Sequence, residues 1–85
     1  MKIRYLVCYD ISDPKRLHKV HRKMKGYGDA WQHSVFCCDL TNSEKIVLQS
    51  ELHGLINHKE DQILFINLGS AFSEKSENIE TLGRA

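Results

Sequence analysis

The chain has 85 residues and a formal net charge of +1, with 12 Lys and Arg residues against 11 Asp and Glu residues. This length predicts one domain with a small core, for which dimerisation would bury further surface. Because the charges nearly balance, the composition alone gives no reason to expect a nucleic-acid partner. No apolar run approaches the ~20 residues of a membrane span, and no signal-peptide pattern is present. We therefore expect one cytoplasmic domain over residues 1–85.

An apolar stretch near the N-terminus predicts a central strand. Residues 3–9 read Ile-Arg-Tyr-Leu-Val-Cys-Tyr and alternate little in polarity, which is typical of a strand covered on both faces. Asp10 follows directly. Asp13-Pro14 then predicts a helix start, with Asp13 as the cap and Pro14 at the first helical position. Because α/β sheets tend to bind ligands at strand carboxyl ends, Asp10 is a candidate site residue; the alternative is a simple turn or cap.

Residues 14–26 have the pattern of an amphipathic helix. Leu17, Val20, Met24 and Tyr27 recur at helical spacing and predict a narrow core stripe. The chain has no acidic residue between positions 14 and 28. A helix face with one sign of charge favours a polyanion partner, whereas the alternative is an ordinary solvated face. The candidate nucleic-acid-binding residues are Lys15, Arg16, Lys19, Arg22 and Lys23.

The next segments are less clearly patterned. Gly26-Tyr27-Gly28 predicts a helix end with a left-handed glycine cap. Residues 30–40 predict an extended segment that is either one bent strand or two short strands. Cys8, Cys37 and Cys38 lack metal-type spacing, so we expect small buried side chains in a reducing compartment.

The second half of the chain predicts another helix and strand. Thr41 and Glu44 form a capping box, and the following helix turns Val47 or Leu48 inward, then Leu52, Leu55 and Ile56. Residues 62–68 predict a second central strand broken by Gly69, and residues 79–83 a short edge strand after a polar loop. This order predicts an α+β sandwich of the ferredoxin-like kind, with both helices on one face of the sheet.

Several segments together resemble the CRISPR-associated protein two family. They are Tyr9-Asp10-Ile11-Ser12-Asp13, the basic helix, Gly26-Tyr27-Gly28, Gln32-His33-Ser34-Val35-Phe36 and Ile63-Leu64-Phe65-Ile66-Asn67-Leu68. Their order and spacing carry the resemblance, which covers nearly the whole chain. It implies a ferredoxin-like βαββαβ fold with a short extra C-terminal strand. It also implies a homodimer, in which residues 70–85 form a loop and an edge strand that exchanges with the partner protomer.

The resemblance also implies a function. Members of this family are small partners of the CRISPR integrase in spacer acquisition and are also described as metal-dependent endoribonucleases. Asp10 maps onto the family's catalytic carboxylate and ligand of Mg²⁺ or Mn²⁺, one from each protomer near the two-fold axis. Lys15 and Arg16 map onto its basic positions, and Tyr9, Ser34 and Phe36 onto supporting positions. Family members often carry arginine shortly before the Ser-Val-Phe segment, where this chain has Trp31 and Gln32.

Two functions fit these residues. As an enzyme, the chain needs two Asp10 side chains across a dimer axis, because one carboxylate is a poor site for Mg²⁺. As a binding module, the doubled basic helices contact DNA or RNA phosphates and hold the integrase subunits apart without a metal. A small-molecule sensor on this fold has no supporting ligand motif. We expect the spacer-acquisition role, with nuclease activity as a further property.

Overall fold

The computed structural model describes residues 1–71 and 80–84. In these ranges the chain forms four strands and two helices in the predicted order βαββαβ. The strands are β1 (Ile3–Asp10), β2 (Asp29–Gln32), β3 (Val35–Leu40) and β4 (Gln62–Ser70), and the helices are α1 (Pro14–Lys25) and α2 (Asn42–His53).

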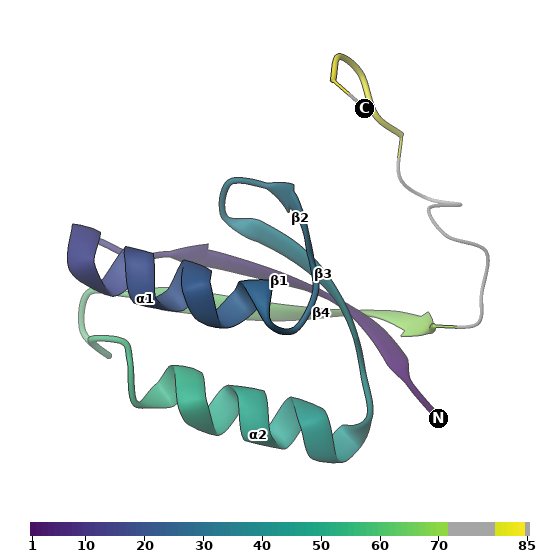
Figure 1. Cartoon of the computed structure of the whole chain (residues 1–85), viewed down its shortest axis with the longest axis horizontal. Helices are drawn as coiled ribbons and strands as arrows, with labels where there is room; N and C mark the ends of the chain where they lie inside the picture. The colour runs from purple at the N-terminus through teal and green to yellow at the C-terminus, as the bar shows by residue number, and fades with distance from the viewer. Residues whose placement is uncertain (72–79, 85) are drawn as a thin grey trace.

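The strands form one antiparallel sheet in the order β2-β3-β1-β4, and both helices lie on the same side of it (Figure 1). Val7 of β1 lies opposite Phe36 of β3 and Phe65 of β4. This arrangement confirms the ferredoxin-like prediction and the central place of β1. The prediction of a second central strand was wrong for the single chain, because β4 lies at the edge of the sheet.

The core fills the space between the sheet and the helices. Val7 has no exposed surface, and neither have Val20 and Met24 of α1 or Leu48 of α2. The core stripe of α1 is confirmed. On α2, Leu48 points inward and Val47 stays 52% exposed, which decides between the two residues that the sequence offered.

The opposite face of the sheet is not covered by either helix. Leu64, Ile66 and Leu68 of β4 are 47%, 43% and 40% exposed. The prediction that β1 is covered on both faces was therefore wrong for one copy of the chain. The apolar residues on the second face of β1, such as Leu6 and Cys8, are only half-buried.

Both ends of α1 lie where they were predicted, since the helix runs from Pro14 to Lys25 with Gly26 as its C-cap, but the predicted conformation of that cap is wrong. Asp13 caps the helix by accepting a hydrogen bond from the Arg16 backbone N–H at 2.9 Å. Gly26, however, has φ −79°, so the predicted left-handed cap was wrong. The glycine that the structure requires is Gly28, where a Cβ would overlap the Cys37 carbonyl oxygen. Glycine is required here because β3 passes close to the backbone, not because the residue has a left-handed conformation.

The remaining elements resolve what the sequence left open. Residues 29–40 are two strands joined at His33-Ser34, rather than one bent strand. The capping box of α2 is confirmed, since Thr41 and Glu44 exchange hydrogen bonds of 2.8 and 3.1 Å. Gly69 does not end β4, which continues to Ser70 with Gly69 at φ 95°.

The C-terminal segment is only partly described. Residues 80–84 belong to no strand of the single chain, and residues 72–79 lie outside the described ranges. Exchange of an edge strand over residues 79–83 with a partner protomer therefore stays a prediction.

Candidate functional site

Asp10 ends β1 and lies at the rim of the sheet. It is exposed, pairs in register with Gln62 of β4, and alternates with Tyr9, whose side chain is buried under the helices. Within residues 1–71 and 80–84, no hydrogen bond or ion pair engages the Asp10 carboxylate. Its oxygens are thus accessible to a ligand from outside the chain, as a catalytic or metal-binding carboxylate requires.

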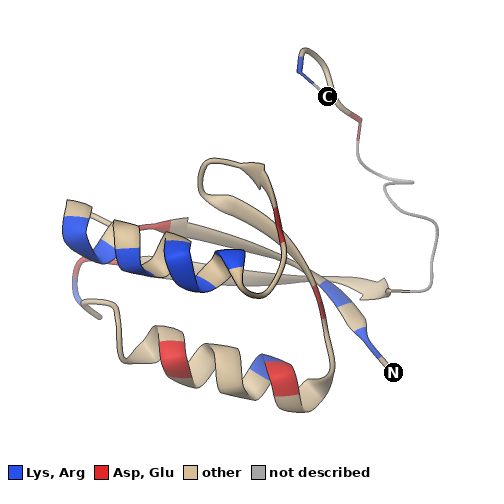
Figure 2. Cartoon of the chain, in the orientation of Figure 1, with Lys and Arg blue, Asp and Glu red and all other residues tan. Residues whose placement is uncertain are grey.

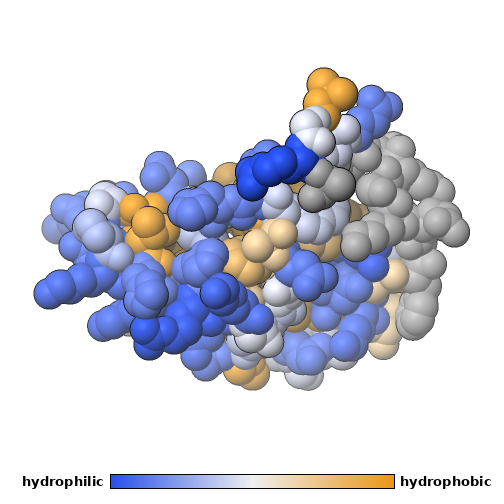
Figure 3. Space-filling view, turned by 45° about the horizontal axis from the view of Figure 1, so that its top comes forward, coloured by the Kyte–Doolittle hydropathy of each residue, from blue (hydrophilic) through white to orange (hydrophobic). Residues whose placement is uncertain are grey.

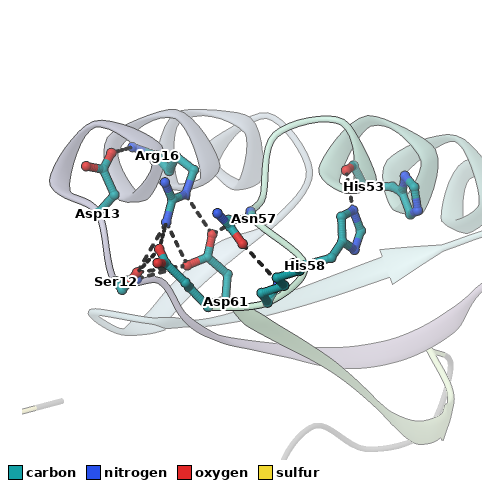
Figure 4. Close-up of polar contacts among 9 residues, drawn as sticks. Ser12, Asp13, Arg16, His53, Asn57, His58 and Asp61 are labelled. Carbon is teal, nitrogen blue, oxygen red and sulfur yellow. Dashed lines mark hydrogen bonds and ion pairs between the residues drawn. The ribbon is translucent and has the colours of Figure 1, made fainter.

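A polar network fixes the turn that follows Asp10 (Figure 4). Asp61, just before β4, accepts hydrogen bonds from the Ser12 backbone N–H at 3.0 Å and from the Asn57 backbone N–H at 2.8 Å. Its other major partner is the Arg16 guanidinium, whose Nε donates at 2.8 Å. The Asp61 side chain has no exposed surface. The Arg16 hydrogen bond, with the backbone donors, holds the pKa of Asp61 well below its ordinary value. The network joins the β1–α1 turn to the loop before β4.

Arg16 is therefore largely occupied within the chain. Besides Asp61, it contacts Glu60 at 3.1 Å. The two carboxylates keep the pKa of Arg16 above its ordinary value. Sequence reasoning singled out Arg16 but not Asp61. The sequence does hold one local signal for Asp61, which is its spacing from Asn57. At this spacing an aspartate carboxylate can accept a hydrogen bond from a backbone N–H and so close a loop.

The other basic residues of α1 divide into two groups (Figure 2). Lys15, Lys19 and Arg22 are exposed, and Arg22 Nη2 lies 2.8 Å from the His18 ring. Lys23 instead pairs with Glu51 of α2 at 2.9 Å. Lys19 and Arg22 also line a groove of about 350 Å³ whose other wall includes Leu55. The side of the molecule shown in Figure 3 is mostly hydrophilic, with hydrophobic residues in small patches.

Tyr9, Ser34 and Phe36 form a support beneath this end of the sheet. The Tyr9 backbone N–H donates to the Ser34 carbonyl at 3.0 Å, and the Tyr9 ring stacks on Phe36 with centroids 6.2 Å apart. Burial raises the pKa of the Tyr9 hydroxyl. The hydroxyl contacts His21 Nδ1 at 2.9 Å and donates to the His33 carbonyl at 3.3 Å. These side chains hold β1, α1 and the β2–β3 turn together.

Metal-ligand chemistry is sparse within one copy. The described residues contain no group of three or more His, Cys, Asp or Glu side chains that could hold a metal ion. No disulfide joins the cysteines of the described residues; Cys37 and Cys38 are buried as predicted, whereas the prediction was wrong for Cys8, which is only half-buried because it lies on the open face of the sheet. Burial raises the pKa of Cys38 to about 11, which keeps it a thiol. Asp10 alone cannot hold Mg²⁺, but its exposed position allows a second carboxylate from another copy to approach.

The fold agrees with comparisons to known proteins. The family model described as CRISPR associated protein Cas2 matches residues 1–75. The chain belongs to the Cas2 family. A Rhodospirillum rubrum Cas2, named CRISPR-associated endoribonuclease Cas2 1, is 43% identical over 95% of this chain and 78% of its own length. The Geobacter sulfurreducens CRISPR-associated endoribonuclease Cas2 is 32% identical over 99% of this chain and 87% of its own.

Solved Cas2 structures share the whole fold. The crystal structure of Streptococcus pyogenes Cas2 at pH 6.5 aligns with a TM-score of 0.82 and 35% identity, covering 94% of this chain and 99% of that one. A hypothetical protein from Thermus thermophilus, TT1823, aligns with a TM-score of 0.85 and 28% identity over 99% and 94% of the two chains. No helix in the described part of this Cas2 chain is long and apolar enough to cross a membrane.

Proposed function

We propose that this chain acts in CRISPR adaptation as a homodimer that binds nucleic acid and cleaves it with the help of a divalent metal. The observation that carries the proposal is the exposed Asp10 carboxylate at the end of β1, directly before the turn into a helix of one charge sign. Relatives that span most of this chain are named endoribonucleases. A metal-dependent phosphodiester hydrolase uses carboxylates to hold its metal and cationic side chains to hold the phosphate backbone.

The open face of the sheet supports the homodimer. Leu64, Ile66 and Leu68 lie on a strand that is an edge in the single chain, beside the half-buried Leu6 and Cys8 on β1. A contiguous apolar surface on a small domain is typical of an interface. Pairing two copies through this face adds the buried surface that an 85-residue domain lacks.

The same pairing completes a metal site. Asp10 precedes α1 and alternates with Tyr9, so it belongs to the open face rather than the core face. Two such carboxylates from facing copies would supply oxygen ligands for Mg²⁺ or Mn²⁺, ions that keep several waters. A divalent ion in such a site activates water and offsets negative charge on the phosphate.

The basic helix supplies the nucleic-acid contact. Lys15, Lys19 and Arg22 are exposed to solvent, and two-fold symmetry would double them. Contacts of this kind bind phosphates without reading sequence. Because Arg16 and Lys23 are held in ion pairs with acidic residues, they contribute less to this contact than the sequence suggested.

The second candidate function is a scaffold without catalysis, which holds a duplex and positions the CRISPR integrase subunits. It is favoured by the basic helix, which needs no metal, and by the lack of a complete metal-ligand set within the described residues. Both functions use the same dimer and the same helix. They differ in what Asp10 does.

The substitution Asp10→Ala separates them. We expect Mg²⁺-dependent cleavage of RNA or DNA to fall by orders of magnitude, while duplex affinity and dimer mass are kept, because the Asp10 carboxylate makes no hydrogen bond or ion pair within the described residues. Asp29→Ala, which removes an exposed carboxylate from β2, is the matched control and should cleave normally. Undiminished cleavage by Asp10→Ala would refute the catalytic assignment. Loss of cleavage with spacer acquisition intact would favour the scaffold as the physiological function.

A further inference from the structure

The β2–β3 hairpin carries an aromatic side chain that lies outside the core cluster. Trp31 is half-buried on the edge strand β2, next to the exposed Gln32 and His33. The strand pairing shifts between Ala30 and Gln32, so Trp31 sits at a bulge. Within the described chain, Trp31 is not among the residues packed on the core and makes no hydrogen bond or aromatic ring contact.

Such a placement is unusual for tryptophan. Its ring is the largest apolar side chain and normally contributes its area to a core or an interface. Bulges often turn a side chain toward a functional surface. The β2 bulge thus places a half-buried indole at the sheet edge, outside the core cluster of the described residues.

The hairpin is held at a fixed place relative to the basic helix. The Tyr9 hydroxyl lies 2.9 Å from His21 Nδ1 and 3.3 Å from the His33 carbonyl oxygen, so it bridges the helix and the hairpin. The His21 ring also lies 6.2 Å from the His33 ring and packs edge-on against Phe36 at 5.3 Å. These contacts join α1 to the hairpin that carries Trp31.

Cations flank this junction on the helix. Burial, together with the nearby Lys25, His33 and His18, lowers the pKa of His21. Arg22 and Lys25 are exposed on the same last turns of α1. Because His21 on these turns contacts the hairpin, a phosphate backbone bound by Arg22 and Lys25 would pass near it. Aromatic side chains next to such a path are typical of single-strand binding, in which unpaired bases stack on the rings.

We propose that Trp31 is a stacking platform for an unpaired base of the nucleic acid that follows α1. The proposal rests on the proposed function and adds to it a preferred substrate class, a single-stranded segment. Bases within a duplex are stacked on their neighbours and do not offer a free face. Trp31 therefore distinguishes single strands from duplexes, whereas the lysines and arginines of α1 bind both.

The chain contains a single tryptophan, so its emission reports on this residue alone. Titration of the full chain with unlabelled oligo(dT) should quench Trp31 emission in parallel with binding. A duplex of the same length should bind with little quenching. Unchanged emission at saturation with oligo(dT) would overturn the proposal.

Substitutions give a second, independent test. Trp31→Ala should weaken oligo(dT) binding at least about fivefold, the lower end for one stacked base, with duplex affinity unchanged. Trp31→Phe should recover most of the loss, because it keeps a ring. Ile46→Ala, which truncates a 56% exposed apolar residue on α2, is the control and should bind like the parent. Since stacking is not electrostatic, Trp31→Ala should weaken binding by the same factor at every salt concentration.

The remaining outcomes are also decisive. An equal loss for oligo(dT) and duplex, or a changed dimer mass in Trp31→Ala, would overturn the proposal and place Trp31 in the fold or in an interface between copies. Duplex binding without oligo(dT) binding by the parent chain would refute this inference and leave the proposed function standing. Binding of neither would refute both.

Discussion

Asp61 shows how a single carboxylate organises the candidate site. It accepts hydrogen bonds from Ser12, Asn57 and Arg16, which belong to three separate segments. In the unfolded chain an aspartate titrates near pH ~3.9. Because folding lowers the pKa of Asp61, its contribution to stability is fully present above about pH 4 and is lost as the pH falls towards the folded-state pKa.

Asp61→Asn tests this contribution. We expect a lower melting temperature at pH 7 and a smaller further decrease on acidification from pH ~4, because an amide cannot gain the proton that weakens the parent network. Thermal melts followed by circular dichroism across this pH range measure both effects. Asp29→Asn, at an exposed position, should melt like the parent at each pH. A parent-like pH profile for Asp61→Asn would contradict the role of the network.

The individual residues also show where sequence reasoning works and where it stops. Asp13 was predicted as a cap because its partner, the Arg16 backbone N–H, lies three residues away. The pairing of Arg16 with Asp61 joins residues 45 positions apart. No local pattern encodes such a pairing, so Arg16 was assigned to nucleic acid from its charge and from the family resemblance. Asp10 was a candidate because its place after an apolar strand is a local signal.

At the scale of elements, local rules predicted the helix starts better than the ends. The caps at Asp13 and Thr41 use side chains within one turn of the helix. The role of Gly28 depends on β3, which passes so close that a Cβ would overlap the Cys37 carbonyl oxygen. The same dependence on neighbours explains β4. Its run of apolar residues predicted a central strand. In the structure β4 is an edge strand, and some of its apolar residues lie on the open face of the sheet.

The two glycines after α1 should respond differently to alanine. Gly28→Ala forces the Cys37 carbonyl and the Cys38 sulfur to move and should cost about 1–3 kcal/mol of unfolding free energy, as overpacking does. Gly26→Ala places a Cβ at 3.4 Å from the Lys23 carbonyl oxygen, in a right-handed conformation that alanine accepts, and should be nearly neutral. Urea denaturation measures both. Equal losses for the two variants would contradict the close-approach argument.

Helix α1 should dominate the electrostatics of nucleic-acid binding. On duplex DNA, each lost phosphate contact should reduce the magnitude of the log–log salt slope by about 0.9. The triple substitution of Lys15, Lys19 and Arg22 by alanine removes the exposed cations and should flatten the slope most. Lys23→Ala, which removes a lysine already paired with Glu51, is the comparison and should change the slope little. A parent-like slope in the triple variant would show that α1 is an ordinary solvated face.

At the scale of the whole molecule, the open face of the sheet is the feature that the proposed dimer must explain. Ile66→Lys places a charge in the middle of this face and should convert the dimer to a monomer in light scattering at micromolar concentration. Val47→Lys makes the same change at a 52% exposed position on α2 and should leave the dimer intact. A dimeric Ile66→Lys variant would show that the copies pair elsewhere.

The central claim is that two copies of the chain share one metal through their Asp10 carboxylates. The most direct test is the stoichiometry of Mn²⁺ binding, measured by calorimetric titration of the full chain. The account predicts one ion per two chains, with binding lost in both Asp10→Ala and the monomeric Ile66→Lys variant. One ion per chain, or binding that survives Asp10→Ala, would contradict it.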